Sequence, residues 1–174
     1  QGIGLGIALA MAKQGCHIVV TDIKAETCSK AVEEVKKLGV DAISVVANVA
    51  KKSDVEKLVL ETMKHFGKLD ILVNNAGIYP YVPFNKMTEE DWDKVMDVNL
   101  KGVFLCTRLA SEVMTAGSRV VTISSIASIV GFENLVHYCT SKGGVNGFTR
   151  ALALEMAPKN ITVNAVAPGA IETP

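Results

Sequence analysis

The strongest constraint on the fold is the alternation of strand-like and helix-like segments along the chain. Short apolar runs rich in Val and Ile are typical of buried strands, and they occur at 16–20, 42–46, 69–73, 120–123 and 161–166. Amphipathic segments separate these runs for most of the chain. A β-α-β-α-β order requires crossover connections, so the sequence predicts a parallel sheet with helices on both faces.

Helix start and stop signals bound the segments between the strands. Helices are expected at 5–13, 24–38, 53–66, 93–114 and 137–157, with a further helix start at 88–90. Ser53 and Asp54 are candidate caps of the third helix, and Gly67 ends it. Asn99 falls inside the long helix at 93–114, where an asparagine is mildly unfavourable.

Composition narrows the class of protein. A chain of 174 residues predicts one domain, and 49% hydrophobic residues can fill a sizeable core. Eighteen basic and eighteen acidic residues cancel, which argues against nucleic acid or a charged membrane surface as a partner. No apolar run approaches the roughly 20 residues that span a bilayer. The four cysteines lack metal-ligand spacing, so we expect a soluble cytoplasmic protein with reduced thiols and no metal site.

Candidate ligand-binding residues follow the predicted strands. Parallel sheets bind ligands beyond the carboxyl ends of their strands. The polar residues and glycines at or just after these ends are Gly4, Asp22, Asn48, the segment 74–77, Ser125, Pro168 and Gly169. The sequence therefore predicts a ligand site along one edge of the sheet.

Glycines at the start of the first helix indicate a phosphate site. Gly2 and Gly4 would let backbone N–H groups approach an anion that the helix N-terminus favours. Asp22 ends the next strand eighteen residues after Gly4, where a dinucleotide-binding unit places the carboxylate that binds a ribose. The alternative is that Asp22 only caps the helix that follows.

Tyr138 and Lys142 form the candidate catalytic pair. They are four residues apart on the predicted helix 137–157, so they share one face. An ammonium group one turn away favours a phenolate, which makes a tyrosine hydroxyl more useful as an acid or base near neutral pH. Ser125, placed opposite, would hold a carbonyl or alcohol oxygen while the tyrosine exchanges its proton. By itself the Tyr-x-x-x-Lys spacing is equally compatible with chance.

Six motifs in order make the chain resemble the single-domain short-chain dehydrogenase/reductases over nearly its whole length. They are G-I-G at 2–4, N-N-A-G at 74–77, V-N-L-K-G at 98–102, I-S-S at 123–125, Y-C-T-S-K at 138–142 and P-G-x-I-x-T at 168–173. Ser125 precedes Tyr138 by thirteen positions, the usual interval of the family. The resemblance implies a doubly wound Rossmann fold that forms a single dinucleotide-binding and catalytic domain over 1–174.

The resemblance also implies roles for individual residues. The catalytic residues would be Asn99, Ser125, Tyr138 and Lys142: the tyrosine as general acid/base, the serine on the substrate oxygen, the lysine beside the tyrosine and on the nicotinamide ribose, and Asn99 as the anchor of a water. The cofactor-binding residues would be Gly2, Ile3, Gly4, Asp22, Asn48, Val49, Asn75, Ala76, Gly77, Tyr138, Lys142, Pro168, Gly169, Ile171 and Thr173.

Asp22 favours NAD over NADP as the cofactor. Its carboxylate would accept hydrogen bonds from the ribose hydroxyls of NAD but would meet like charge in the 2′-phosphate of NADP. NADP-using relatives commonly have an arginine where this chain has Gln1 or Ile23, although Lys24 lies nearby. Asn48 replaces the usual aspartate at the adenine, and its amide oxygen would still accept a hydrogen bond.

The resemblance also has gaps. Family members usually begin a strand earlier, with T-G-x-x-x, and continue beyond the last motif with a lid and a final strand. We therefore expect an internal fragment that lacks the first, central strand and the C-terminal part. Three alternatives to the dehydrogenase remain: a sugar-nucleotide epimerase or dehydratase, a non-catalytic sensor of NAD, and an inactive truncated product.

Partner and substrate expectations are coarser. The predicted substrate is a small carbonyl compound or secondary alcohol, and keto-acyl thioesters, sugars, steroids and diketones all stay open. Its candidate pocket residues are Tyr79, Tyr81, Val130, Phe132, Leu135 and His137. The family also implies a homodimer or homotetramer through the two long helices, with Gly143, Gly144 and Gly147 permitting close approach of the subunits.

Overall fold

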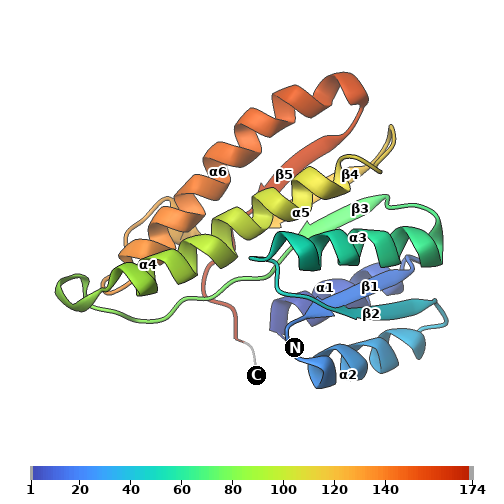
Figure 1. Ribbon diagram of the computed structural model, residues 1–174, viewed down its shortest axis with the longest axis horizontal. Helices are drawn as coiled ribbons and strands as arrows, with labels where there is room; N and C mark the ends of the chain where they lie inside the picture. The colour runs from blue at the N-terminus through green and yellow to red at the C-terminus, as the bar shows by residue number, and fades with distance from the viewer. Residues whose placement is uncertain (1, 173–174) are drawn as a thin grey trace. The chain divides into compact units, whose positions relative to one another are not determined.

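The computed structural model describes residues 2–172, which form two compact units (Figure 1). The first unit runs to residue 67 and includes 171 and 172, and the second comprises 68–170.

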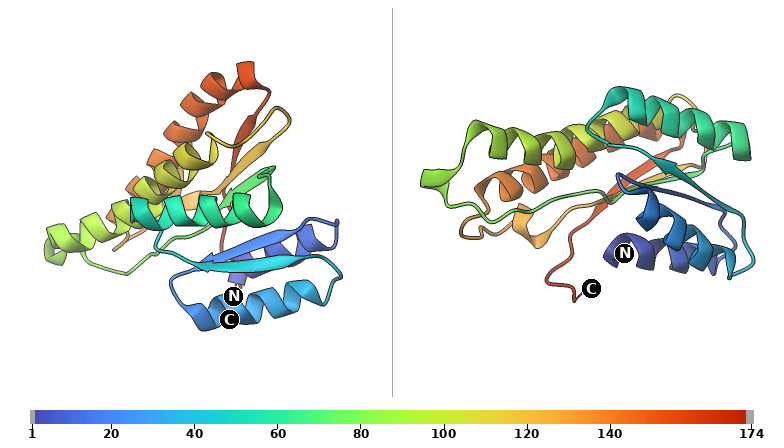
Figure 2. Two further views of the ribbon diagram at one scale, coloured as in Figure 1. Left: turned by 45° about the vertical axis from the view of Figure 1, so that its right-hand side comes forward. Right: turned by 60° about the horizontal axis from the view of Figure 1, so that its bottom comes forward.

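The first unit contains two strands and three helices. In chain order they are α1 (Gly2–Ala12), β1 (Ile18–Asp22), α2 (Ala25–Lys36), β2 (Ala42–Val46) and α3 (Lys52–Phe66). β1 pairs with β2 in parallel, with Asp22 opposite Val46. α1 and α2 cover one face of this pair and α3 lies on the other (Figure 2). Ala12, Val35 and Ala42 form the buried centre of the face that α1 and α2 cover.

The second unit is built on three parallel strands. Its elements are β3 (Ile71–Asn74), the 3-10 turn η1 (Phe84–Lys86), α4 (Glu89–Met96), the π-helical segment η2 (Asp97–Lys101), α5 (Gly102–Ala110), β4 (Arg119–Ile123), the 3-10 turn η3 (Ile126–Ser128), α6 (Val136–Met156), the 3-10 turn η4 (Ala157–Lys159) and β5 (Thr162–Val166). The strand order is β3-β4-β5.

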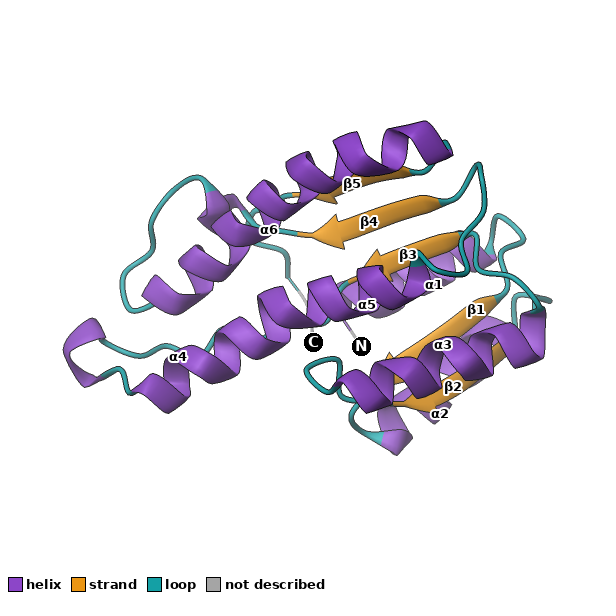
Figure 3. Ribbon diagram, turned by 45° about the horizontal axis from the view of Figure 1, so that its top comes forward, coloured by secondary structure: helices purple, strands orange, loops and turns teal. Residues whose placement is uncertain are grey.

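Helices α5 and α6 pack against this sheet (Figure 3). Ala110 and Met114, from α5 and the turn after it, meet Val120, Ile161 and Val163 in one buried cluster. Burial of these apolar side chains stabilises the unit at roughly 25 cal/mol per Å² removed from water. The same packing holds the carboxyl ends of β4 and β5 beside the first half of α6.

The structure confirms the five predicted strands and the parallel α/β order, with small shifts at their ends. β1 begins at Ile18 instead of residue 16, because the Cys16 N–H still bonds the Met11 carbonyl at the end of α1. Thr88 caps α4 reciprocally with Asp91, as its helix-start signal predicts. Ser53 and Asp54 do not cap α3, since they lie in its first turn after the cap residue Lys51.

The helix expected at 93–114 runs from 89 to 110 and contains a π-helical segment that the sequence did not predict. The chain forms α4, then a π-helical segment at 97–101, then α5. The Gly102 N–H bonds the Asp97 carbonyl, five residues back, so one extra residue is inserted into the helix. Asn99 lies within this insertion and is fully buried.

Gly144 has a different role from the one expected. A Cβ at Gly144 would lie 2.9 Å from Leu100 Cδ2, so the glycine makes room for Leu100 of its own chain. A Cβ at Gly143 or Gly147 would meet nothing within 4 Å. The space beside these two glycines is therefore open in the described part of the chain. No helix among the described residues is long and apolar enough to cross a membrane.

Candidate active site

The strands of the second unit bring three predicted segments to one edge. Asn74 lies opposite Thr122, and Ile123 lies opposite Val166, so the residues that follow β3, β4 and β5 leave the sheet at the same end. The Ser124 N–H bonds the Val166 carbonyl at 2.7 Å, and the Ile126 N–H bonds the Pro168 carbonyl at 2.9 Å. Asn75–Gly77, Ser125 and Pro168–Gly169 thus lie at this edge, as expected of ligand-binding residues in such sheets.

Lys142 is the central charge of this edge. Its side chain is buried on α6, and its Nζ donates to the Ile123 carbonyl at 2.7 Å. The same Nζ lies 5.7 Å from the centre of the Tyr138 ring, so the structure brings the predicted lysine and tyrosine together. Helical spacing sets their common face, and the end of β4 fixes the lysine head group.

Burial lowers the pKa of the Lys142 ammonium to about 8, because removal from water disfavours the charged form. A Cβ at Gly77 would lie 3.6 Å from Lys142 Nζ and 3.4 Å from Asn99 Oδ1. The segment after β3 therefore passes close to the lysine, and a Cβ at position 77 would make ordinary van der Waals contact with both side chains.

Tyr138 is held at the start of α6 by its neighbour His137. The Tyr138 N–H donates to His137 Nδ1 at 2.9 Å, which satisfies one of the unpaired donors of the helix N-terminus. His137 is fully buried, and burial lowers the pKa of its imidazole against the opposing effect of the Asp91 carboxylate. The Tyr138 ring lies 5.9 Å from that of Tyr79, centre to centre.

Asn99 holds the segment after β3 through two reciprocal hydrogen bonds. Its Oδ1 accepts from the Ile78 N–H at 2.8 Å, and its Nδ2 donates to the Ile78 carbonyl at 2.8 Å. Nδ2 also donates to Ser141 Oγ at 3.2 Å, and Ser141 Oγ donates to the Tyr138 carbonyl at 2.7 Å. The Asn99 side chain thus links the Gly77–Ile78 segment to α6.

Ser125 occupies the corner between β4 and η3. Its backbone is extended, and its Oγ accepts from the Ala127 N–H at 3.1 Å. Because a serine hydroxyl has one proton and two acceptor sites, this bond leaves the proton available for an external oxygen. Ser125 is partly exposed, as a residue that contacts substrate must be.

Several polar contacts of the site were not predicted from the sequence. They are those of Ser124, Ser128, Ser141 and Asn146, together with the cluster in which Asn74 Nδ2 donates to the hydroxyls of Thr107 and Thr122. Ser141 and Asn146 lie on α6 at three and eight positions after Tyr138. That spacing placed them on the same helix as the catalytic pair, but hydroxyl and amide residues on a helix more often face solvent.

The first unit presents a separate group of predicted cofactor residues. Gly2, Ile3 and Gly4 form the first turn of α1, and Gly2 has φ 59°, a conformation that favours glycine. No acidic side chain occurs in that first turn, so its N-terminus offers an anion no repulsion. These features fit a pyrophosphate.

Asp22 ends β1 and does not cap α2. Lys24 is the residue in the cap position, and its N–H donates to Asp22 Oδ1 at 2.9 Å. A carboxylate has about four acceptor sites, so this bond leaves capacity for the hydroxyls of a ribose. Ile23, beside it, is 66% exposed and carries no charge.

Asn48 and Val49 follow β2 at the same end of the strand pair as Asp22. The Asn48 amide oxygen accepts from the Ala50 N–H at 3.0 Å, and the Asn48 N–H donates to Asp54 Oδ2 at 2.9 Å. The amide oxygen expected to bind adenine is therefore already used once, with one acceptor site remaining. Ile171 is 55% exposed, and Thr173 lies outside the described residues.

The candidate substrate residues divide into two groups. Tyr79, Tyr81, Val130 and Phe132 are exposed, which suits a binding surface. Leu135 and His137 are buried, so they offer little side-chain surface to a substrate. Sequence alone did not distinguish them, because all six lie in or near loops.

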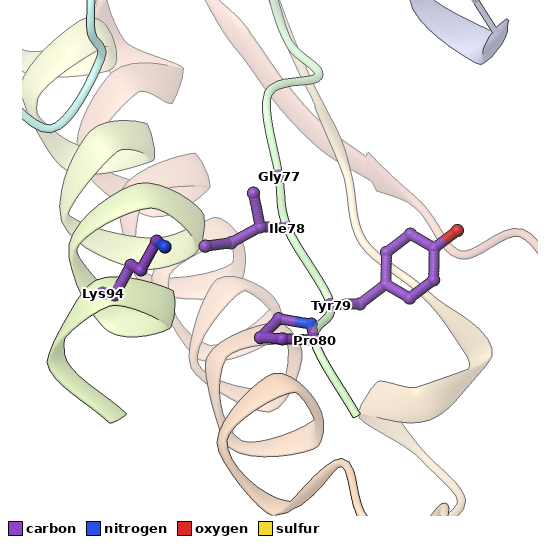
Figure 4. A pocket seen from close by; sticks show the side chains of 5 residues that line it. All are labelled: Gly77, Ile78, Tyr79, Pro80 and Lys94. Carbon is purple, nitrogen blue, oxygen red and sulfur yellow. The ribbon is translucent and has the colours of Figure 1, made fainter. Parts of the chain in front are cut away.

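An open pocket of about 400 Å³ lies beside the segment after β3 (Figure 4). It is lined by Gly77, Ile78, Tyr79, Pro80 and Lys94. Ile78 and Pro80 point toward α4, which carries Lys94, whereas the Tyr79 ring points the other way. Gly77 is the only residue of this lining that the sequence analysis assigned to the cofactor.

Comparison with known proteins identifies the family. The family model described as short chain dehydrogenase matches residues 1–174. The chain is 43% identical over 176 residues to a 3-oxoacyl-[acyl-carrier-protein] reductase of Synechocystis, covering 99% of this chain and 71% of that protein.

Solved structures agree with this assignment. A dehydrogenase/reductase from Sinorhizobium meliloti superimposes with a TM-score of 0.96 at 34% identity, over 99% of this chain and 69% of that one. An NAD⁺-bound xylitol dehydrogenase superimposes with a TM-score of 0.95 at 33% identity, over 100% of this chain and 68% of that one.

This chain belongs to the short-chain dehydrogenase family, and the doubly wound Rossmann fold predicted from its sequence is confirmed. Family membership supports oxidoreductase chemistry with a nicotinamide cofactor.

The lowered pKa of Lys142 predicts a pH-dependent effect of Lys142→Met on stability. Between about pH 8 and 10.5 the folded chain binds fewer protons than the unfolded chain, so the free energy of unfolding of the wild type rises with pH. We expect the free energy of unfolding of Lys142→Met, relative to that of the wild type, to be highest near pH 7. This difference should fall by about 1 to 3 kcal/mol by pH 10.5.

Urea denaturation at several pH values measures this difference in the cofactor-free protein. Lys30→Met is the control, because the Lys30 side chain is 71% exposed. A stability difference between Lys142→Met and wild type that stays constant from pH 7 to 10.5 would contradict the buried ammonium.

Proposed function

We propose that this protein transfers a hydride reversibly between NAD(H) and a carbonyl compound or secondary alcohol, with Tyr138 as general acid/base. The main support for this proposal is the buried Lys142. Its Nζ donates to the Ile123 carbonyl and lies 5.7 Å from the centre of the Tyr138 ring. Burying a cation costs free energy of folding. Beside Tyr138 the ammonium would stabilise the phenolate that forms when the tyrosine gives up its proton.

Each of the four catalytic residues has a distinct task in this proposal. Ser125 donates its hydroxyl proton to the substrate oxygen, and Tyr138 gives a proton to that oxygen in reduction or takes it in oxidation. Lys142 stabilises the charged tyrosine and reaches the nicotinamide ribose. Asn99 holds the Ile78 backbone in place beside Lys142, and as the family resemblance implies it anchors a water. When bound, the nicotinamide supplies or accepts the hydride.

Both units contribute to this function. The residues assigned to the adenosine and pyrophosphate, Gly2, Ile3, Gly4, Asp22, Asn48 and Val49, belong to the first unit, and the catalytic residues belong to the second. Since the family model spans 1–174, we propose that the two units form one dinucleotide-binding and catalytic domain.

Tyr138→Phe tests the catalytic role. We expect the variant to lose NADH-dependent reduction of a ketone panel by at least about 10²-fold, because the general acid that protonates the substrate oxygen is removed. Lys30→Met on α2 is the control, since the Lys30 side chain is 71% exposed and no catalytic or binding role is proposed for it.

The outcome separates the alternatives that the sequence left open. Retained turnover in Tyr138→Phe would refute Tyr138 as the acid/base. A wild-type protein that binds NADH but reduces no ketone of the panel would favour a non-catalytic sensor of NAD, and a protein that neither folds nor binds NADH would favour an inactive product.

The proposed cofactor preference is NAD over NADP. Asp22 ends β1 next to the uncharged Ile23, so the nearest described group to a 2′-phosphate at this strand end would be a carboxylate. The NAD⁺-bound xylitol dehydrogenase, a structural relative, supports a site of this kind. Lys24 is the nearby cation that opposes the preference.

Asp22→Asn tests the preference. The amide keeps the acceptor for the Lys24 N–H but removes the negative charge. We expect the ratio of kcat/KM for NADH to that for NADPH to fall about tenfold, as loss of roughly 1.4 kcal/mol of discrimination implies. Glu26→Gln, on the exposed first turn of α2, is the control. An unchanged ratio, or equal use of both cofactors by the wild type, would refute the assignment.

The substrate class is a modest-sized carbonyl or hydroxyl compound. The Tyr79 ring lies 6.4 Å from that of Tyr81 and 5.9 Å from that of Tyr138, centre to centre, so an aromatic ring adjoins the ring of the proposed acid/base. The reductase of 3-oxoacyl-[acyl-carrier-protein] among the relatives makes keto-acyl thioesters the first compounds to include in the panel.

The proposed assembly is a homodimer or homotetramer formed through α5 and α6. A depression of about 470 Å³ on the second unit is lined by Met96, Asp97, Leu100, Lys101, Phe104, Gly144 and Phe148. Phe104 is 48% exposed there, and large apolar side chains of this kind are enriched at subunit interfaces. The open space around Gly143 and Gly147 is compatible with a second copy.

Phe104→Glu tests the assembly. We expect the variant to be a monomer in multi-angle light scattering at concentrations where the wild type is a dimer or tetramer, because a carboxylate would be desolvated in the interface. Leu60→Glu on α3, at a side chain that is 63% exposed, is the control. A monomeric wild type would refute the proposal.

A further inference from the structure

Asn146 connects α6 to the corner that carries Ser125. It lies four residues after Lys142 and eight after Tyr138, so all three share one side of the helix. Neither the motifs of the sequence nor the proposed catalytic residues include it. Its carboxamide nevertheless forms hydrogen bonds with Ser124, immediately before Ser125, and with Ser128, three residues after it.

Four hydrogen-bonding groups form a continuous chain at this corner. Ser124 Oγ donates to Asn146 Oδ1 at 2.8 Å, and Asn146 Nδ2 donates to Ser128 Oγ at 2.7 Å. Ser128 Oγ in turn donates to the Ser125 carbonyl at 2.6 Å. Ser124 also has a longer contact of 3.4 Å with the Lys142 carbonyl. The chain of bonds therefore starts at the end of β4 and finishes on Ser125 itself.

The direction of these bonds fixes the orientation of the carboxamide. A serine hydroxyl has a single proton, and that of Ser128 is used on the Ser125 carbonyl. Ser128 Oγ must therefore accept from Asn146, which places Nδ2 toward Ser128 and Oδ1 toward Ser124. Only an amide offers a donor and an acceptor in this arrangement, so an aspartate of the same size does not replace it.

We propose that Asn146 is a positioning residue. Its hydrogen bonds to Ser124 and Ser128 fix Ser125 relative to Tyr138 and Lys142, which lie on the same helix as Asn146. Ser125 has an extended backbone with φ −165° and ψ 156°, and the turn η3 that follows it has only three residues. The bonds from α6 supply the restraint that such a short turn lacks. This proposal rests on the proposed function, in which Ser125 binds the substrate oxygen.

Asn146→Asp tests the proposal with little change of volume. A carboxylate cannot donate to Ser128, so the Ser128 hydroxyl turns toward it and releases the Ser125 carbonyl. We expect kcat to fall about tenfold to a hundredfold, since small misplacements of a catalytic group have effects of this size. The KM for NADH should change less than about twofold, because the cofactor is bound by other residues. Asn146→Ala is the second variant, which avoids a buried charge.

A double-mutant cycle shows whether the effect acts through Ser125. In a Ser125→Ala background, Asn146→Asp should lower the remaining activity less than about twofold. An equal loss in both backgrounds would mean a general structural defect and would overturn the proposal. Thr149→Val is the control on α6, because the buried Thr149 hydroxyl has no hydrogen-bond partner among the described residues.

A readout independent of activity completes the test. Amide hydrogen exchange of 125–128 should speed up in both Asn146 variants and stay unchanged in Thr149→Val. If Ser125→Ala and Tyr138→Phe abolish turnover while both Asn146 variants keep wild-type kcat, only the positioning role is refuted. If Ser125→Ala keeps full turnover, the proposed function fails. Unchanged amide exchange at 125–128 in the Asn146 variants would separately refute the positioning role.

Discussion

The second unit depends on one buried charge, the Lys142 ammonium, and on what satisfies it. Its Nζ donates to the Ile123 carbonyl at the last residue of β4, so the helix that carries Tyr138 is fixed to the strand that precedes Ser125. Burial lowers the pKa of this ammonium to about 8, which records the cost of holding a charge away from water. A fold selected only for stability would gain by replacing it with an apolar side chain.

The remaining polar contacts position backbone around that charge. Asn99 binds both backbone groups of Ile78 and reaches α6 through Ser141, while Asn146 reaches the Ser125 corner through Ser124 and Ser128. Asn99 thus links the segment after β3 to α6, and Asn146 links the corner of Ser125 to α6. Asn99 is fully buried and Asn146 is half-buried, and amides removed from water are costly unless they are paired.

The candidate catalytic residues could be named from the sequence because each belongs to a short motif. Tyr138 and Lys142 share a helical face by their spacing, and Ser125 follows a β-branched run that is typical of a buried strand. Asn146 and Ser141 were not predictable, since their use depends on which loops pack against α6. The π-helical insertion at 97–101 was not predicted for a similar reason. The apolar spacing of an α-helix continues through it, and the inserted residue shows only in the hydrogen bond from Gly102 to Asp97.

The sequence by itself determined the strands, the parallel α/β order, the family and the candidate catalytic residues, because these follow from local periodicity and fixed spacing. Tertiary structure decided which side chains are buried and what they bond: it placed Leu135 and His137 in the interior, turned Gly144 toward Leu100, and connected Asn146 to the corner of Ser125. Such contacts join residues far apart in the chain, and their partners are set by packing, which no local pattern encodes.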